Sequence, residues 1–307
     1  MIHLVTLNPA LDLELELREA EQGKIGDVVG SDIQAGGKAI NVARFLKKTK
    51  IPFTAWLGTG GGVHPTHVLY NSLLAKEGIK VRFLSAQAPV RWNVVVGLGN
   101  GRKKYNHPGF ELDLDFFGRL QQSLHKGDHI VLTGRLPQGM NDSLYASWVT
   151  AFNRKGVLTI VDSSGKPLRK VLEAKPWFFK VNRQELLEAF GQKNAGLSAV
   201  LRLKRGPLAK MGLTHGAVTD GADGALVWDE KETLRVRYTG KPVKGFVVGA
   251  GDGFLAGYLR GVQLKKSLKD RALLACATAT AVAQSGIMDF SIKSIKNLKK
   301  KIIVKKV

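Results

Sequence analysis

The 307-residue chain contains one cysteine, Cys276, which excludes an internal disulfide and any cysteine-rich metal site. Cys276 lies in the apolar stretch 273–277, and we interpret it as a packed helical residue rather than a reactive one. No apolar run approaches the roughly 20 residues of a membrane span. The first residues also lack the basic region and apolar core of a signal peptide. We therefore expect a soluble, cytoplasmic protein without a membrane partner.

Acidic residues are also scarce, with 25 Asp and Glu against 47 Lys and Arg and a net charge of +22. Such a balance raises nucleic acid or an anionic membrane as a partner. The densest basic run, residues 293–306, is interleaved with Ile292, Ile295, Leu298 and Ile302 at helical spacing, so we interpret it as the solvated face of a packed terminal element. No zinc-finger or RNP aromatic motif supports nucleic-acid binding. A basic bias also suits an enzyme whose substrates are all phosphorylated.

The chain lacks a Walker loop, because no Gly-Lys-Ser/Thr follows its glycines. A different glycine-rich turn, Gly249-Ala250-Gly251-Asp252, leads into an apolar helix. Small residues allow backbone N–H groups to converge where a helix N-terminus already favours an anion. Asp252 is positioned to accept a proton from an attacking hydroxyl. The alternative is an ordinary strand-to-helix turn in which Asp252 is the N-cap.

A second glycine pair, Gly36-Gly37, opens another helix that continues through Lys38 and Asn41. Lys38 and Asn41 are three residues apart, so they share a face near a helix N-terminus and could bind an anion there. The alternative is a core helix with a solvated lysine.

Short apolar runs alternate with helical patterns along the chain, which predicts βα units and a mostly parallel sheet. The expected buried strands are Ile2–Thr6, Phe53–Leu57, Ile130–Thr133, Leu158–Asp162, Trp177–Val181 and Ala217–Thr219. The expected helices are Lys38–Lys48, His67–Glu77, Asp142–Arg154, Arg183–Phe190, Ser198–Lys210, Gly253–Leu264 and Ser267–Ser285. Asp12–Leu17 and Arg91–Leu98 instead alternate polar and apolar residues, which is typical of strands with one exposed face.

Eight segments in this order resemble the PfkB (ribokinase-like) family of carbohydrate kinases, and they cover nearly the whole chain. They are residues 6–12 (TLNPALD), 36–44, 91–93, 134–139, 161–165, 180–185, 218–225 and 249–252. The opening segment is similar to the branch that phosphorylates sugar phosphates, which contains 1-phosphofructokinases and tagatose-6-phosphate kinases. The resemblance implies a three-layer α/β sandwich with a mostly parallel central sheet and a small β-sheet lid. It places the core at residues 1–10, 24–88 and 111–307 and the lid at 11–23 and 89–110, and it implies a homodimer formed through the lid.

The resemblance also implies a substrate site. Asp12 lies just past the first strand, at the edge where ligands of parallel sheets bind, and would accept hydrogen bonds from sugar hydroxyls. The phosphate already on the substrate would meet Lys38, Asn41 and Arg91, since arginine offers a planar, bidentate set of donors. The full expected substrate set is Asp12, Gly37, Lys38, Asn41, Arg91, Asn106 and Arg135.

For the nucleotide, the expected residues are Asn182, Thr219, Asp220, Gly221, Gly224 and Gly251. Asn182 and Glu185 stand three apart at a helix start and could face Mg²⁺ or its waters. Residues 219–224 could equally form a β-hairpin turn without a ligand, and Asn182 with Glu185 an ordinary helix cap.

The implied reaction is transfer of the ATP γ-phosphoryl group to the primary hydroxyl of a ketohexose phosphate, fructose 1-phosphate in preference to tagatose 6-phosphate. Asp252 would be the base, with Gly249, Ala250 and Gly251 forming the anion-binding turn. Two alternatives are a kinase of an unphosphorylated sugar or nucleoside and a non-catalytic binder of sugar phosphates or polyanions.

The chain departs from the family pattern at several positions. A commonly basic position is Gly30, and the usual Thr-Glu before the lid asparagine is replaced by Lys103 and Lys104. As a hypothesis, Arg135 and one of these two lysines replace the missing phosphate contact.

Overall fold

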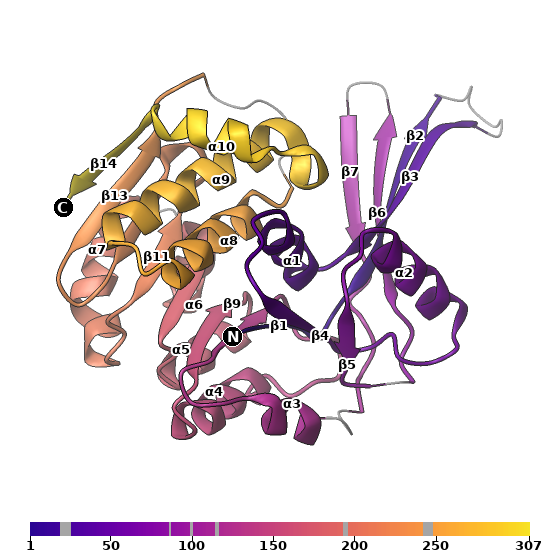
Figure 1. The fold of residues 1–307 in the computed structure, drawn as a ribbon, viewed down its shortest axis with the longest axis horizontal. Coiled ribbons are helices and arrows are strands. Elements are labelled where there is room, and N and C mark those ends of the chain that lie inside the picture. Colours follow the sequence, from indigo (N-terminus) through magenta and orange to yellow (C-terminus); the bar gives the residue numbers. More distant parts are fainter. Residues whose placement is uncertain (19–25, 86, 99–100, 114–116, 193–195, 242–247) are drawn as a thin grey trace.

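The computed structural model describes residues 1–18, 26–85, 87–98, 101–113, 117–192, 196–241 and 248–307. A large sheet of ten strands lies between two layers of helices, and a separate sheet of four strands projects from one side (Figure 1). The architecture is the three-layer α/β sandwich with a smaller sheet that the sequence predicts.

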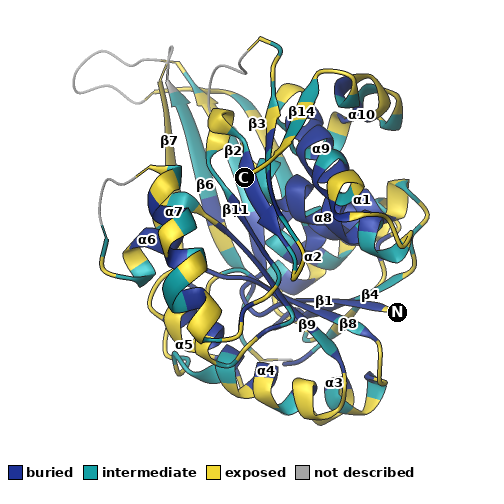
Figure 2. Ribbon diagram, turned by 90° about the vertical axis from the view of Figure 1, so that its left-hand side faces the viewer, coloured by how far each residue is buried: buried dark blue, intermediate teal, exposed yellow. Residues whose placement is uncertain are grey.

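The large sheet has the order β14-β13-β12-β11-β10-β9-β8-β1-β4-β5. Its strands are β1 (Ile2–Thr6), β4 (Phe53–Leu57), β5 (Val81–Phe83), β8 (His129–Thr133), β9 (Leu158–Asp162), β10 (Phe178–Asn182), β11 (Gly216–Thr219), β12 (Ala225–Trp228), β13 (Thr233–Tyr238) and β14 (Ile302–Lys306). The pairs from β5 to β11 are parallel, whereas β12, β13 and β14 add an antiparallel edge. The central strands β1, β8, β9 and β10 are almost entirely buried, as expected for a sheet covered on both faces (Figure 2), whereas no residue of the edge strand β5 is buried.

Two hydrophobic clusters define the helical layers. One face of the sheet packs against α1 (Lys38–Lys48), α2 (Pro65–Lys76), α8 (Ala250–Gln263), α9 (Leu268–Asp289) and α10 (Ile292–Lys299). The other face packs against α3 (Phe117–Ser123), α4 (Leu144–Arg154), α5 (Pro167–Glu173), α6 (Arg183–Ala189), α7 (Leu197–Leu203) and the π-helical turn η1 (Lys204–Leu208). The short 3₁₀ turn η2 (Gly221–Asp223) connects β11 to β12.

Helix α9 corrects one expectation from the sequence. Within its 22 residues an 18-residue window has a mean hydropathy of 1.2, which together with the helix length matches a membrane span, a run not expected from the sequence. Half of it is buried inside the protein, where it packs against α8, α10 and the sheet (Figure 1). These contacts are those of a core helix, whose apolar residues face protein rather than lipid.

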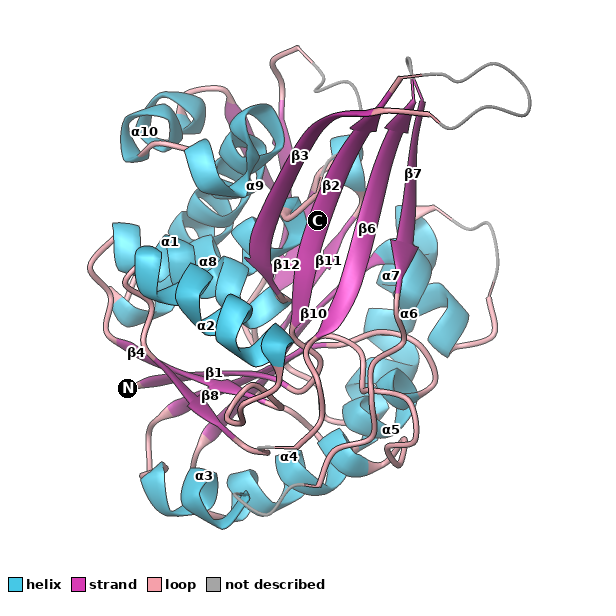
Figure 3. Ribbon diagram, turned by 90° about the vertical axis from the view of Figure 1, so that its right-hand side faces the viewer, coloured by secondary structure: helices cyan, strands magenta, loops and turns pink. Residues whose placement is uncertain are grey.

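The second sheet, which we call the lid, has the order β3-β2-β6-β7 (Figure 3). Its strands are β2 (Ala10–Leu17), β3 (Val28–Gly36), β6 (Arg91–Leu98) and β7 (Gly101–Asn106). The expected division assigns residues 24–88 to the core, but β3 pairs antiparallel with β2 and so lies in the lid sheet. Its sequence, VVGSDIQAG, has too little apolar alternation to be recognised as part of the lid.

Candidate active site

The carboxyl ends of β8, β9 and β10 bring polar residues to one edge of the parallel sheet. Asp162 ends β9 and Asn182 ends β10, and Gly134 directly follows β8. In parallel α/β sheets ligands bind at this edge. The first turns of α1 and α8 lie above it, so residues far apart in the sequence meet there (Figure 1).

The first turn of α8 provides a set of backbone donors. Gly249 is the N-cap and has φ 81°, a left-handed conformation that glycine adopts without strain. The N–H groups of the next three residues, Ala250, Gly251 and Asp252, have no partner within the helix because they precede its first hydrogen-bonded turn. The sequence expects the helix to start at Gly253, but it starts at Ala250 and includes the whole turn. The turn can therefore bind an anion at the positive end of the helix dipole.

Asp252 is only 6% exposed, and its carboxylate Oδ2 accepts a hydrogen bond of 2.7 Å from Asn41 Nδ2. Burial raises the pKa of Asp252; Lys38 opposes this shift, and the nearby carboxylate of Asp162 adds to it. A carboxylate whose pKa lies above its usual range is a better proton acceptor.

The N-terminus of α1 brings Lys38 to the same place. Gly37, with φ 124°, turns the chain so that Lys38 Nζ donates to Asp162 Oδ1 at 2.7 Å. Burial lowers the pKa of Lys38, but the charges of Asp162 and Asp252 outweigh burial and raise it above its ordinary value. The sequence predicts that Lys38 and Asn41 bind the substrate's own phosphate. In the structure Lys38 contacts Asp162 at the end of β9, and Asn41 contacts Asp252 at the start of α8.

A second lysine shares the Asp162 carboxylate. Lys180 is 5% exposed, and its Nζ lies 3.3 Å from Asp162 Oδ2. The two lysines outweigh the effect of burial and lower the pKa of Asp162. A Cβ on Gly251 would lie 2.8 Å from Lys180 Nζ, so glycine at 251 lets this ammonium approach the backbone of the α8 turn.

No role is expected from the sequence for Lys180 or Asp162, although both fall within segments that carry the family resemblance. A signal was available, because Lys180 interrupts the apolar strand Trp177–Val181 and Asp162 ends another. Charged residues are almost never buried unless they are paired.

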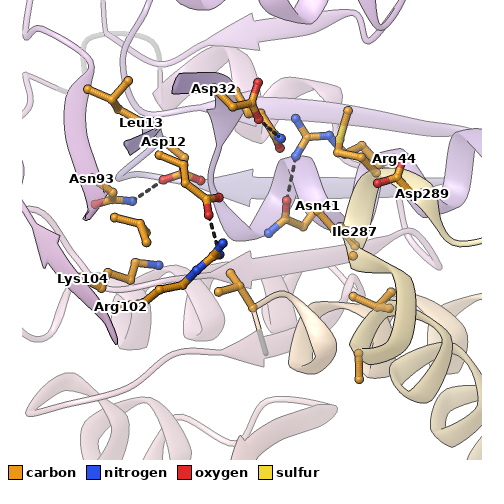
Figure 4. Close-up of a pocket in the computed structure, with 18 residues that line it drawn as sticks. Asp12, Leu13, Asp32, Asn41, Arg44, Asn93, Arg102, Lys104, Ile287 and Asp289 are labelled. Atoms are coloured by element: carbon orange, nitrogen blue, oxygen red, sulfur yellow. Dashed lines mark hydrogen bonds and ion pairs between the residues drawn. The ribbon is translucent and has the colours of Figure 1, made fainter. Parts of the chain in front are cut away.

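A cavity of about 290 Å³ lies between the lid and the first helical layer (Figure 4). Asp12 projects into it and accepts a 2.6 Å hydrogen bond from Asn93 Nδ2. A Cβ on Gly36 would lie 2.1 Å from Asp12 Oδ2, so a glycine is required beside this carboxylate. Asn41, which donates a hydrogen bond to Asp252, also lines the cavity, so the cavity extends to the residue next to Asp252.

Five expected substrate residues lie outside the lining of this cavity: Gly37, Lys38, Arg91, Asn106 and Arg135. Arg91 donates to the backbone carbonyls of Asn8 and His107 and to the Asn93 side chain, so it joins the strands and loops beside Asp12. Burial, partly offset by Asp12, lowers the pKa of Arg91. Arg135 is exposed and lies near Ser164 Oγ, at 3.4 Å, and Asn106 is an exposed partner of Asn93 in the lid. The cations that do line the cavity are Arg44, Arg102 and Lys104.

Two of these cations, Arg102 and Lys104, lie on the inner face of the lid, which faces the cavity, and they differ in their ion pairs. Arg102 of β7 forms ion pairs with Glu14 and Glu16 of β2, across the intervening strand β6. Lys104 has no ion pair within the part of the chain that the structure describes, and it lines the cavity. Lys103 alternates with Lys104 along β7 and therefore points to the opposite face of the lid.

A second cavity of about 280 Å³ lies on the other side of the α8 turn. Of the residues expected to bind nucleotide, it is lined by Thr219, Gly221, Gly224 and Gly251. Asp220 forms an ion pair with Arg183 at 2.8 Å and is not part of the lining. Ala283 lines both cavities, so the two meet beside the first turn of α8.

Asn182 and Glu185 form the capping box of α6, as the simpler interpretation of their spacing predicts. Asn182 Oδ1 accepts from the Glu185 N–H at 2.7 Å, and Glu185 Oε2 accepts from the Asn182 N–H at 2.9 Å. This leaves one oxygen of Glu185 without a capping role, and its charge acts on Lys38 across the site. Among the described residues no three acidic, His or Cys side chains could enclose a metal ion. Asn182 and Glu185 alone suit Mg²⁺, because this ion keeps much of its water and relies on substrate phosphates as ligands.

Fold and site together define a class of protein: an α/β phosphotransferase with an anion-binding helix N-terminus, a buried carboxylate and two adjoining cavities. The family model of pfkB carbohydrate kinases matches residues 12–293, and the chain belongs to that family. It is therefore an ATP-dependent phosphotransferase whose acceptor is an alcohol group of a carbohydrate.

The chain is similar to curated proteins named 1-phosphofructokinase. It is 32% identical over 293 residues to the one from Escherichia coli, which covers 92% of this chain and 91% of the relative. It is 28% identical over 290 residues to the one from Borreliella burgdorferi, with 93% and 92% covered. Among solved structures, phosphofructokinase-2 from Escherichia coli in complex with substrates and products matches with a TM-score of 0.86 and 25% identity, covering 97% of this chain and 98% of that one.

Proposed function

We propose that this protein transfers the γ-phosphoryl group of ATP to the primary hydroxyl of a ketohexose phosphate, with fructose 1-phosphate preferred over tagatose 6-phosphate. The observation that carries the proposal is the position of buried Asp252 and the α8 turn where two cavities meet. The cavity under the lid would hold the sugar, and the cavity lined by Thr219 and Gly224 would hold the nucleotide. The relatives named 1-phosphofructokinase support the preference for fructose 1-phosphate.

In the proposed mechanism, Asp252 accepts the proton of the attacking hydroxyl while the oxygen attacks the γ-phosphorus. The raised pKa of Asp252 suits this role, because it brings the carboxylate closer to the working pH as a base. Its Oδ2 is bonded to Asn41, which leaves Oδ1 for the substrate hydroxyl. Asp12, held by Asn93, would orient the sugar through its other hydroxyls.

The transferring phosphoryl group would lie against the N–H groups of Ala250, Gly251 and Asp252. Lys180, which lies close to Gly251, and Lys38 supply positive charge beside it. Such preorganised donors stabilise charge that develops in the transition state. Mg²⁺, when bound with the nucleotide, would neutralise phosphate charge, and Glu185 with Asn182 would hold it through water molecules.

The phosphate already on the sugar requires a cation near the lid, and Lys104 is the best candidate. It lines the sugar cavity without an ion pair in the described residues, whereas Arg102 is engaged by two glutamates. Arg135 stays part of the hypothesis as an exposed cation near Arg91.

We also propose a homodimer formed through the outer face of the lid, and a cytoplasmic location. The outer face carries apolar side chains of three strands, among them Trp92, Val94, Val96 and Tyr105. Trp92 and Tyr105 are exposed, and no helix crosses this face in Figure 3. A face of this kind in a soluble enzyme marks an interface.

The proposal is tested by measuring magnesium-dependent ADP release from ATP with fructose 1-phosphate, tagatose 6-phosphate and fructose 6-phosphate. Fructose and ribose serve as unphosphorylated controls. We expect selective turnover of fructose 1-phosphate and a loss of about 100- to 10,000-fold in Asp252→Asn, the range for removal of a general base. A folded Asp252→Asn protein that keeps most of its activity would refute the role of Asp252. Absence of turnover with every sugar phosphate, together with salt-sensitive retention on DNA, would favour a non-catalytic polyanion binder.

A further inference from the structure

A line of buried polar contacts leads away from Asp252 to the far end of α2. Asn41 donates to Asp252 at 2.7 Å, Arg44 donates to Asn41 at 2.8 Å, and Glu77 accepts from Arg44. Asn41 and Arg44 are three residues apart and share one face of α1. Glu77 is the C-cap of α2, so three separate helices contribute to the line.

Arg44 is 5% exposed and its guanidinium is almost fully used. Nε and Nη2 donate to the two carboxylate oxygens of Glu77, each at 2.7 Å, in a bidentate pair. Nη2 also donates to the carbonyl of Ala35 at 2.6 Å, while Nη1 donates to Asn41 Oδ1. This planar, fixed fork of donors cannot be reproduced by a lysine, whose ammonium is a single point charge.

The contact with Arg44 decides which way the Asn41 amide faces. An amide has an acceptor on one side and two donors on the other. Since Arg44 has only donors, it must meet Oδ1, which turns Nδ2 toward Asp252, as Figure 4 shows for the Arg44–Asn41 contact. If the amide turned over, its oxygen would face the Asp252 carboxylate, and two acceptors would repel each other.

We propose that Arg44, held by Glu77, is a positioning residue that fixes the Asn41 amide and thereby keeps Asp252 ionised and correctly directed for proton abstraction. The inference rests on the proposed function of Asp252 as the base. Arg44 acts only through Asn41 and contacts neither the reacting hydroxyl nor the transferred phosphoryl group.

The other groups that face Asp252 set the direction of the expected effect. Lys38 on α1 and Lys180 on β10 favour its ionised form, as does the hydrogen bond from Asn41, whereas burial and Asp162 on β9 disfavour it. Loss of the Asn41 donor removes one of the three stabilising contacts and leaves both opposing effects. The pKa of Asp252 should therefore rise when Arg44 no longer fixes the amide.

The test compares the pH dependence of kcat/KM in the wild type, Arg44→Gln, Arg44→Lys and Glu77→Gln. We expect the acid limb to move up by about one pH unit in both Arg44 variants, and by less in Glu77→Gln. Activity should fall about tenfold at a pH one unit below the wild-type limb, and it should recover to within about threefold on the alkaline plateau. Arg169→Gln, which removes an exposed ion pair with Glu173 on α5, is the control and should leave the limb unmoved.

A purely structural role would give a different pattern. It would lower activity by one factor at every pH, or lower the melting temperature, and Arg44→Lys would restore it by keeping the charge opposite Glu77. Arg44→Lys also decides the matter if Arg44→Gln does not fold. An unmoved acid limb in folded Arg44→Lys overturns the inference.

A second measurement separates this inference from the proposed function. NMR titration of ¹³C-labelled aspartate, with Asp252 assigned from its loss in Asp252→Asn, gives the pKa of Asp252 without turnover. A higher pKa in Arg44→Lys than in the wild type supports the positioning role, and an equal pKa refutes it. Full activity of Asp252→Asn would instead refute the role of Asp252 as the base, whatever the titration gives.

Discussion

At the scale of single residues, the site is a balance of buried charges. Lys38 and Lys180 share the carboxylate of Asp162, and Asp252 lies within reach of the same charges. Two ammonium groups thus face two carboxylates, so the cluster is neutral while Asp252 is ionised. In the proposed mechanism Asp252 takes a proton, which would give the cluster a net positive charge while negative charge accumulates on the phosphoryl oxygens.

Adjacent lysines of β7 give a test of how the substrate phosphate is bound. Lys104 lines the cavity under the lid, whereas Lys103 lies on the opposite face of the lid. We expect Lys104→Ala to raise KM for the sugar phosphate about tenfold, the loss typical of one hydrogen bond to a charged group, with little change in kcat. Lys103→Ala is the matched control and should leave KM unaltered. Steady-state kinetics with varied sugar phosphate measures both, and equal KM values in the two variants would exclude Lys104.

At the scale of elements, the sequence predicts the parts whose patterns are strong. The helix Lys38–Lys48 and the strands Ile2–Thr6, Phe53–Leu57 and Leu158–Asp162 are confirmed with the expected bounds. The strand β7 is missed because all six of its residues are exposed, so no apolar alternation marks it. It exists because its backbone pairs with β6, which is a contact between segments rather than a local preference.

The candidate site was predictable to a similar extent. Glycines and charged residues at the starts of α1 and α8 mark two candidate anion-binding segments, but their spacing does not show that Lys38 meets Asp162 or that Asn41 meets Asp252. The contacts that give Arg44 its proposed role could not be predicted for the same reason. Its partner Glu77 ends α2, and only the packing of α2 beside α1 brings the two together.

Helix α8, which carries Asp252, packs against α9, and a glycine allows the two helices to approach each other closely. A Cβ on Gly257 would lie 2.7 Å from the carbonyl oxygen of Leu274 in α9. Gly257→Ala should therefore destabilise the protein by about 1–3 kcal/mol, the usual cost of overpacking. Gly118→Ala in α3 is the control, since no atom lies within 4 Å of the new methyl group, and it should be neutral or stabilising. Urea unfolding measures both, and an unchanged midpoint for Gly257→Ala would contradict the packing argument.

At the scale of the whole molecule, the lid should decide the state of association. If its outer face forms a dimer, Val94→Asp places a charge in that interface and should leave a monomer of 33.4 kDa. Val68→Asp, at an exposed apolar residue of α2, is the control and should not alter the mass. Light scattering after size exclusion gives the mass directly. A monomeric wild type, or a dimeric Val94→Asp, would refute the lid interface.

The stability of the whole fold should also depend on pH through the edge of the sheet opposite the site. His129 begins β8, where burial and the nearby Met1 amino group lower its pKa from 6.5 to about 4, against the opposing effect of Asp128. Between these two values the unfolded chain binds a proton that the folded protein does not, so stability falls as the pH drops from 6.5 to 4. One such proton changes the free energy of unfolding by at most about 1.4 kcal/mol per pH unit.

His129→Gln should remove this contribution, so that the melting temperature declines less between pH 6.5 and 4 than in the wild type. His125→Gln is the control, because the His125 side chain is 81% exposed and its removal should leave the decline as it is. Thermal melts at several pH values, with both variants matched to the wild type at pH 8, measure the difference. Asp252 does not cause the decline in stability toward acid pH, because its raised pKa acts in the opposite direction. Folding favours the protonated form of Asp252, so its contribution to stability is lost as the pH rises through the folded pKa. A wild-type decline that persists unchanged in His129→Gln would therefore assign the acid sensitivity to groups other than His129, such as His3 and His215, whose pKa values burial also lowers from 6.5.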